Sequence, residues 1–161
     1  MLKTWNEVRL GQYPSTQAIR AALEADSIKL GSWPEELMDQ VPLAGEPRTV
    51  RLAVVRPSVL FPGRHVKLGT IYRKAELQGG IKCPAEVGLV LHLQVVTPPR
   101  SVYAIAMEPM TSDGYRVLFS VENGIGSSYR WLRGLEGNPN KVWNPGDDPG
   151  LDQIVVQIKD D

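Results

Sequence analysis

The stretch Gly79-Gly-Ile-Lys-Cys-Pro-Ala-Glu-Val-Gly-Leu-Val-Leu-His-Leu-Gln-Val-Val96 divides the chain into two parts of different pattern. Its first half holds two glycines and a proline, which is typical of the end of a helix followed by a chain reversal. In its second half Leu89, Leu91, Leu93 and Val95 alternate with a mixed set of residues, and a period of two predicts a strand. We therefore expect helices before this stretch and mainly strands after it.

The part before the stretch carries two amphipathic helical patterns and a shorter one. Between residues 17 and 25 the apolar residues recur at helical spacing, and Ser15 or Thr16 can cap the first turn. A second helix is predicted over residues 70–78, where Gly79-Gly80 would end it. Ser32-Trp-Pro-Glu35 has the pattern of a capping box and predicts a short helix that reaches about Asp39.

Alternating apolar residues predict strands on both sides of the central stretch. These predicted strands cover residues 4–10, 49–55, 89–96, 102–107, 115–121, 129–132 and 153–159. The resulting expectation is an α+β fold in which an antiparallel meander of five or six strands carries two main helices on one face. Residues 1–161 would form one globular domain, with a helical front part over about 15–80 and mainly strands over about 87–159.

The composition excludes several classes of protein. Eighteen basic and eighteen acidic residues give a formal net charge of zero, whereas nucleic-acid-binding domains usually carry a basic excess. No apolar run approaches the roughly 20 residues that a membrane-spanning helix needs. The N-terminal residues lack the apolar core of a signal peptide, so we expect a cytoplasmic, bacterial-type protein. No spacing of potential ligands indicates a metal site, and no motif indicates a cofactor.

Several short motifs together carry a resemblance. They are Lys82–Gly88, Ile105–Met110, Ser112-Asp-Gly114, Arg130-Trp-Leu132, Gly137-Asn-Pro139 and Trp143. In this combination the chain resembles a family of small uncharacterised bacterial proteins, and the resemblance covers most of its length. It implies one compact domain and no activity, so that no catalytic residue follows from it. Residues 152–159 are less aromatic than the resemblance leads us to expect.

The chain has a single cysteine, Cys83, which is therefore the candidate for a thiol nucleophile. A reactive thiol needs a nearby base, and His65, His92 and Glu86 are the residues that could supply or orient one. With these residues the chain would be a small cysteine-dependent hydrolase or transferase. An extended strand after Cys83 would however place His92 roughly 25–30 Å away. The simpler interpretation is a small buried thiol, with Glu86 accepting hydrogen bonds from nearby backbone.

A second candidate site is the aromatic and polar loop over residues 129–147. Its members are Tyr129, Arg130, Trp131, Asn138 and Trp143. Exposed rings with amides and guanidinium groups can hold a sugar, a peptide or another small polar ligand, although tryptophans in small domains are more often buried. We therefore expect a binding or interaction domain without catalytic activity. Its partner would be an unknown protein or a small polar ligand.

Overall fold

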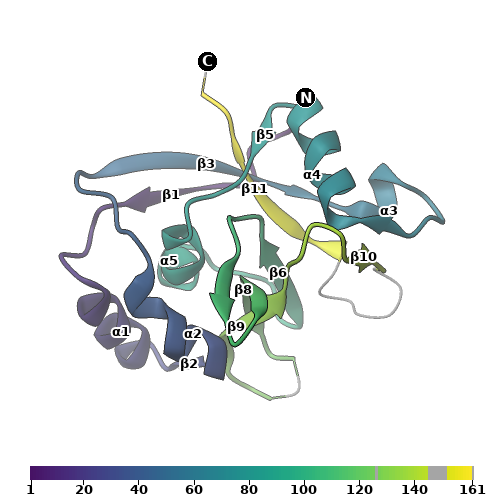
Figure 1. The fold of residues 1–161 in the computed structure, drawn as a ribbon. Coiled ribbons are helices and arrows are strands. Elements are labelled where there is room, and N and C mark those ends of the chain that lie inside the picture. Colours follow the sequence, from purple (N-terminus) through teal and green to yellow (C-terminus); the bar gives the residue numbers. More distant parts are fainter. Residues whose placement is uncertain (126, 145–151, 161) are drawn as a thin grey trace.

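The computed structural model describes residues 1–125, 127–144 and 152–160, and within them it is an α+β fold with one large mixed sheet (Figure 1). The α-helices are α1 (Thr16–Ala25), α2 (Ser32–Leu37), α3 (Pro57–Leu60), α4 (Leu68–Leu77) and α5 (Glu86–Gln94), and one 3-10 turn is η1 (Met38–Gln40). The strands are β1 (Asn6–Leu10), β2 (Ile28–Leu30), β3 (Arg48–Val55), β4 (Val66–Lys67), β5 (Gly80–Ile81), β6 (Ser101–Ile105), β7 (Met110–Ser112), β8 (Tyr115–Asn123), β9 (Arg130–Glu136), β10 (Val142–Trp143) and β11 (Ile154–Ile158).

The sheet is mixed, so the predicted antiparallel meander of five or six strands is wrong. Among the described residues nine strands share it, in the order β1-β3-β11-β6-β8-β9-β2, with β5 beside β11 and β7 beside β8. Two of its pairs, β11 with β6 and β2 with β9, are parallel. The last strand lies in the middle of the sheet because three successive residues, Ile154, Val155 and Val156, are buried, which is the pattern of a central strand.

The predicted strand over residues 89–96 is also wrong, because residues 86–94 form helix α5. Every residue from Glu86 to His92 is buried, and the helix contacts β1, β8, β9 and α1. A helix that is apolar all round has no polar face to reveal its period of 3.6. Its leucines therefore alternate with other residues as they would in a strand, an ambiguity that short apolar runs share.

Most of the predicted amphipathic elements are confirmed. Helix α1 begins at Thr16, and the Ser15 hydroxyl accepts a hydrogen bond from Ala18 N at 3.1 Å, which is the predicted cap. The predicted capping box is wrong: Gly31 caps α2 without a side-chain bond, and Glu35 instead pairs with Arg20 of α1 at 2.7 Å. The helices also do not share one face of the sheet, since α4 lies at the upper right of Figure 1 and α1, α2 and α5 at the lower left.

No helix in the described part of the chain has both the length and the apolar character that crossing a bilayer requires.

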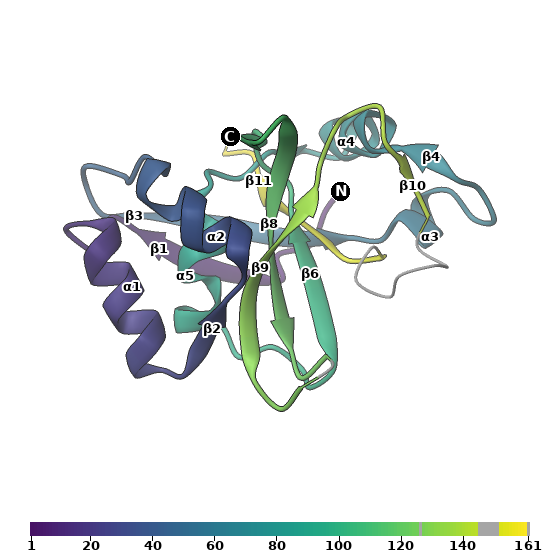
Figure 2. The same cartoon turned by 60° about the horizontal axis from the view of Figure 1, so that its bottom comes forward.

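The small antiparallel pair of β4 and β10 lies outside the large sheet. It joins the loop after β9 to the segment before α4, with Trp143 opposite Val66. Figure 2 shows this pair beside α3, well away from α1 and β2.

Close contact between α5 and β8 depends on Gly88. A Cβ atom at residue 88 would lie 2.9 Å from Phe119 Cβ, a part of the side chain that cannot rotate away. We expect Gly88→Ala to lower the free energy of unfolding, because overpacking costs about 1–3 kcal/mol while alanine recovers only about 1 kcal/mol of helix propensity. Urea denaturation measures the difference.

Gly45→Ala is the matched control, since nothing lies within 4 Å of a Cβ built at Gly45. This variant should keep the stability of the parent protein. An undiminished free energy of unfolding for Gly88→Ala would contradict the packing of α5 against β8.

Candidate functional site

The thiol of Cys83 lies in the core. The residue is 4% exposed, and its Sγ atom is 3.6 Å from the carbonyl oxygen of Val155. Its backbone N–H donates to the carbonyl oxygen of Ala106 at 2.6 Å, which fixes the segment between β5 and α5 against the sheet. Burial raises the pKa of the Cys83 thiol well above its ordinary value, so the reactive thiolate is disfavoured.

The three residues proposed to assist Cys83 have other surroundings. Both carboxylate oxygens of Glu86 accept backbone N–H groups, from Gly11 at 2.8 Å and from Ala44 at 2.7 Å. Nε2 of His92 lies 3.0 Å from the carbonyl oxygen of Glu122. His65 is exposed in the loop before β4. Within the described residues no hydrogen bond joins the Cys83 thiol to any of the three.

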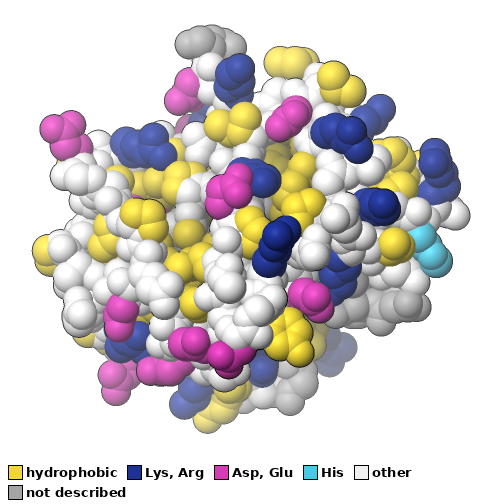
Figure 3. Space-filling view, in the orientation of Figure 1, with side chains coloured by type: hydrophobic (Ala, Val, Ile, Leu, Met, Phe, Trp, Pro, Cys, Tyr) yellow, Lys and Arg dark blue, Asp and Glu magenta, His cyan; other side chains and the backbone are white. Residues whose placement is uncertain are grey.

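Metal ligation has no structural support in the described residues, where no group of three or more His, Cys, Asp or Glu side chains could hold an ion. Exposed acidic and basic side chains occur on the same surfaces of the molecule. Figure 3 shows this on one face of the molecule, where lysine and arginine side chains are interspersed with aspartate and glutamate.

Arg130, a predicted ligand residue, holds the ends of two helices. Its guanidinium donates to the carbonyl oxygen of His92 at 3.1 Å, near the end of α5. It also donates to the carbonyl oxygen of Asp26, the C-cap of α1, at 2.8 Å, and lies 3.2 Å from the Asp26 carboxylate. A cation stabilises helix C-termini, where carbonyl groups lack partners within the helix. Arg130 therefore clamps α1 and α5 to β9.

Asn138 and Trp143 also have structural surroundings. The Asn138 side chain accepts the backbone N–H of Asn140 at 2.9 Å and so closes a turn. The carbonyl oxygens of Pro139 and Lys141 beyond this turn accept the first N–H groups of α4. Trp143 has no exposed surface. This end of the predicted loop fixes the start of α4, while residues 145–147 lie outside the described part of the chain.

Tyr129 and Trp131 retain exposed surface. Tyr129 is 48% exposed, and the ammonium of Lys29 lies 4.8 Å from the centre of its ring. Trp131 donates from Nε1 to the Ser127 hydroxyl at 3.0 Å, and the Arg133 guanidinium covers its ring at 4.0 Å. Strand β9, at about 3.3 Å per residue, separates these aromatic residues from Asn138 and Trp143. The five predicted ligand residues therefore do not form one site.

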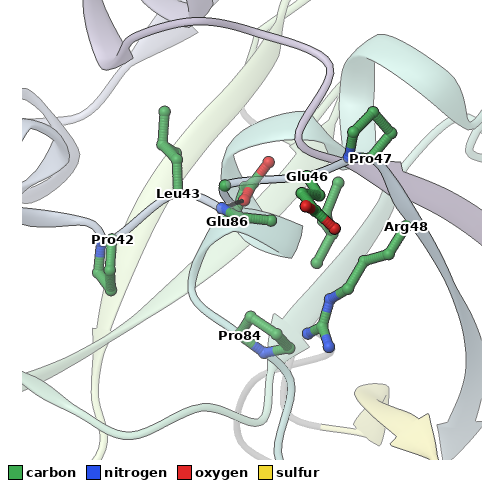
Figure 4. Close-up of a pocket in the computed structure, with 10 residues that line it drawn as sticks. Pro42, Leu43, Glu46, Pro47, Arg48, Pro84 and Glu86 are labelled. Atoms are coloured by element: carbon green, nitrogen blue, oxygen red, sulfur yellow. Dashed lines mark hydrogen bonds between the residues drawn. The ribbon is translucent and has the colours of Figure 1, made fainter.

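Among the surface clefts that the described residues line, two have room for a small-molecule ligand. The first, which we call the β2-edge groove, has a volume of about 560 Å³ and is lined by Arg20, Glu24, residues 27–30, Glu35 and Tyr129. The second, which we call the Glu86 cleft, has a volume of about 530 Å³ and is lined by Leu10, residues 42–48, Pro84 and Glu86 (Figure 4). Both volumes fall in the range typical of small-molecule sites.

The sequence pointed to one residue of each cleft, Tyr129 and Glu86. It missed the charged residues beside them, which are Arg20, Lys29 and Glu35 in the groove and Glu46 and Arg48 in the cleft. These residues come from separate segments that only the tertiary fold brings together, and no local pattern marked them.

Comparison with known proteins adds no relative: no protein-family model, no curated protein and no solved structure matches this chain. The resemblance to a family of small bacterial proteins stays a prediction. The arguments about function therefore depend on the geometry of this chain alone.

The burial of Cys83 makes its reactivity testable. We expect iodoacetamide to label the native thiol far more slowly than the thiol of the denatured chain, because access and ionisation are both suppressed. Mass spectrometry of timed samples measures the rate. A Cys83→Ser, Val59→Cys variant provides an exposed thiol as control, since Val59 is 64% exposed. If native Cys83 were labelled as fast as that control, the result would support the hypothesis of a cysteine-dependent hydrolase or transferase.

The burial of His92 predicts a pH dependence of stability. Burial is the main cause that lowers the pKa of His92 below its ordinary value of 6.5, so the folded protein keeps the imidazole neutral. As the pH falls below about 6.5, the imidazole of His92 binds a proton in the unfolded chain but stays neutral in the folded chain. The free energy of unfolding should then decrease by up to about 1.4 kcal/mol per pH unit.

Urea denaturation between pH 7.5 and 5.5 measures this dependence in the parent protein and in His92→Gln. The variant should show a flatter profile over that range. His65→Gln is the control, because His65 is exposed and should leave the profile as in the parent. Equal slopes for the parent and His92→Gln would mean that His92 is not held neutral.

Proposed function

We propose that this protein is a binding domain that holds an extended polypeptide segment along the free edge of β2. The observation that carries this proposal is that β2 ends the path of strands in the described sheet and is paired with β9 alone. Its other edge opens into the β2-edge groove. An unpaired strand edge is a template on which an incoming strand can form main-chain hydrogen bonds.

The direction of the backbone groups supports this role. The N–H of Gly31 donates to the carbonyl oxygen of Leu132 at 2.8 Å, toward β9. Because successive backbone groups in a strand point to opposite edges, the N–H and C=O of Leu30 point toward the groove. Lys29, the residue before Leu30, is paired with Trp131 of β9. Ile28 is only 4% exposed, so Leu30 provides the accessible backbone donor and acceptor of the groove.

The walls of the groove supply contacts for the side chains of such a segment. Tyr129 lies at one wall with its ring half exposed under the Lys29 ammonium. Glu24 of α1 lines the groove, and the Arg20–Glu35 ion pair, at 2.7 Å, joins α1 to α2. Aromatic and charged groups beside a strand edge are what selects a peptide when main-chain bonds provide the affinity. A three-residue strand with a lysine is also a common way to protect a sheet edge, and binding experiments distinguish these roles.

A random peptide library displayed on phage supplies the probe, and the selected peptide is then titrated into the ¹⁵N-labelled protein. We expect saturable shifts of the amide signals of Ile28 and Leu30, because these residues form the free edge. Tyr129→Ala should weaken the affinity by about tenfold, since a buried aromatic contact contributes 1–2 kcal/mol or more.

Tyr115→Ala is the matched control, because Tyr115 is 52% exposed and lies outside the groove. It should bind the selected peptide as the parent does. Failure to select any peptide, or shifts that avoid residues 27–30, would overturn the proposal. Binding of a small polar compound at the same residues, without any peptide, would assign the groove to that class of ligand instead.

A further inference from the structure

The Glu86 cleft lies at the opposite end of α5 from Arg130 and is separate from the β2-edge groove. It is bounded by the end of β1, the loop that precedes β3 and the segment that leads into α5. Figure 4 shows Pro42 and Leu43 on one side of it, Pro47 and Arg48 on the other, and Pro84 across from Glu86. Its shape is therefore formed by three distant segments of the chain.

The walls of this cleft are apolar and rigid. Leu10, Leu43 and three prolines line it. Proline has a fixed φ and loses little freedom when a ligand orders it. The Glu86 carboxylate also accepts N–H groups from Gly11 and Ala44, and so ties two of the bounding segments together. Such a cleft is formed before any ligand arrives, which reduces the cost of binding.

The carboxyl group of Glu86 lies at one side of the cleft. Glu86 is 1% exposed and lines the cleft, yet no ion pair includes it among the described residues. Each carboxylate oxygen accepts one N–H and has capacity for a further hydrogen bond. A second carboxylate, that of the exposed Glu46, lines the same cleft. This side of the cleft favours a positive group.

The other charged group of the cleft has the opposite sign. Arg48 is exposed, and in the described part of the chain its guanidinium takes part in no ion pair. In Figure 4 this guanidinium is turned toward Pro84, across the mouth of the cleft. A planar guanidinium binds a carboxylate with two parallel hydrogen bonds. The cleft therefore presents carboxylates and one guanidinium around an apolar interior.

We propose that the Glu86 cleft binds a small zwitterion with an apolar body, of the chemical class of a free apolar α-amino acid. The ammonium of the ligand lies at Glu46, in the field of Glu86, the carboxylate pairs with Arg48, and the side chain contacts the prolines. This site involves different residues from the β2-edge groove, so each proposal can fail alone.

L-leucine is the probe, and two relatives of it test the two charges separately. Titration of ¹⁵N-labelled protein with leucine should produce saturable shifts of the amide signals of Gly11 and Ala44, whose N–H groups bond to Glu86. Leucinamide lacks the carboxylate and N-acetyl-leucine lacks the ammonium. Each should bind about tenfold more weakly than leucine, because each leaves one charged group of the cleft without its partner.

Variants assign the charges to residues. Arg48→Gln should lower the affinity for leucine by about tenfold and leave the affinity for leucinamide unchanged. Glu46→Gln should lower the affinity for leucine and leave the affinity for N-acetyl-leucine unchanged. Arg51→Gln and Glu7→Gln are matched controls on the neighbouring strands β3 and β1, outside the cleft. Both should bind leucine as the parent does.

Three results would overturn the proposal. The first is the absence of saturable shifts at Gly11 and Ala44 in concentrated leucine. The second is equal binding of leucine, leucinamide and N-acetyl-leucine, which would indicate an apolar contact without charge recognition. The third is an unchanged affinity for leucine in Arg48→Gln and Glu46→Gln.

Discussion

Helix α5 is joined to the outer edge of β1 by side chains at both of its ends. At the start, Glu86 accepts the N–H of Gly11, just beyond β1, at 2.8 Å. At the end, the Gln94 amide accepts the N–H of Arg9 at 2.7 Å and donates to the carbonyl oxygen of Arg9 at 2.8 Å. The amide of Gln94 thus makes the two bonds that a neighbouring strand would make. A helix enclosed on all sides has to satisfy its polar groups within the protein, and these bonds also cover one edge of the sheet.

Arg130 fixes the C-terminal end of α1 beside that of α5. Arg130 donates to carbonyl oxygens at the C-termini of α5 and of α1, so that β9 holds both helices in one arrangement. Helix α1 forms one wall of the β2-edge groove, and β2 forms the other. Arg130 therefore contributes to the geometry of the groove although it does not line it.

Elements with one polar and one apolar face could be predicted from the sequence, because their period is visible. Helix α1, with its Ser15 cap, and strand β3 are examples. Helix α5 could not be predicted in this way, since burial on every side removes the polar face. The central place of β11 also escapes local patterns, because pairing with β3 and β6 joins residues far apart in the sequence. Residue type alone selected Arg130 and Trp143, yet guanidinium groups also cap helices and tryptophans also fill cores.

The reactive side chains and the exposed charges of this chain lie in different surroundings. The thiol of Cys83 and the imidazole of His92 are buried and directed at backbone carbonyl oxygens, whereas Glu46, Arg48 and Lys29 are exposed. The two clefts lie at opposite ends of α5. Communication between them would need an element with two stable arrangements. Helix α5 is packed on all sides and bonded at both ends, which favours one arrangement, so we infer that the clefts act independently.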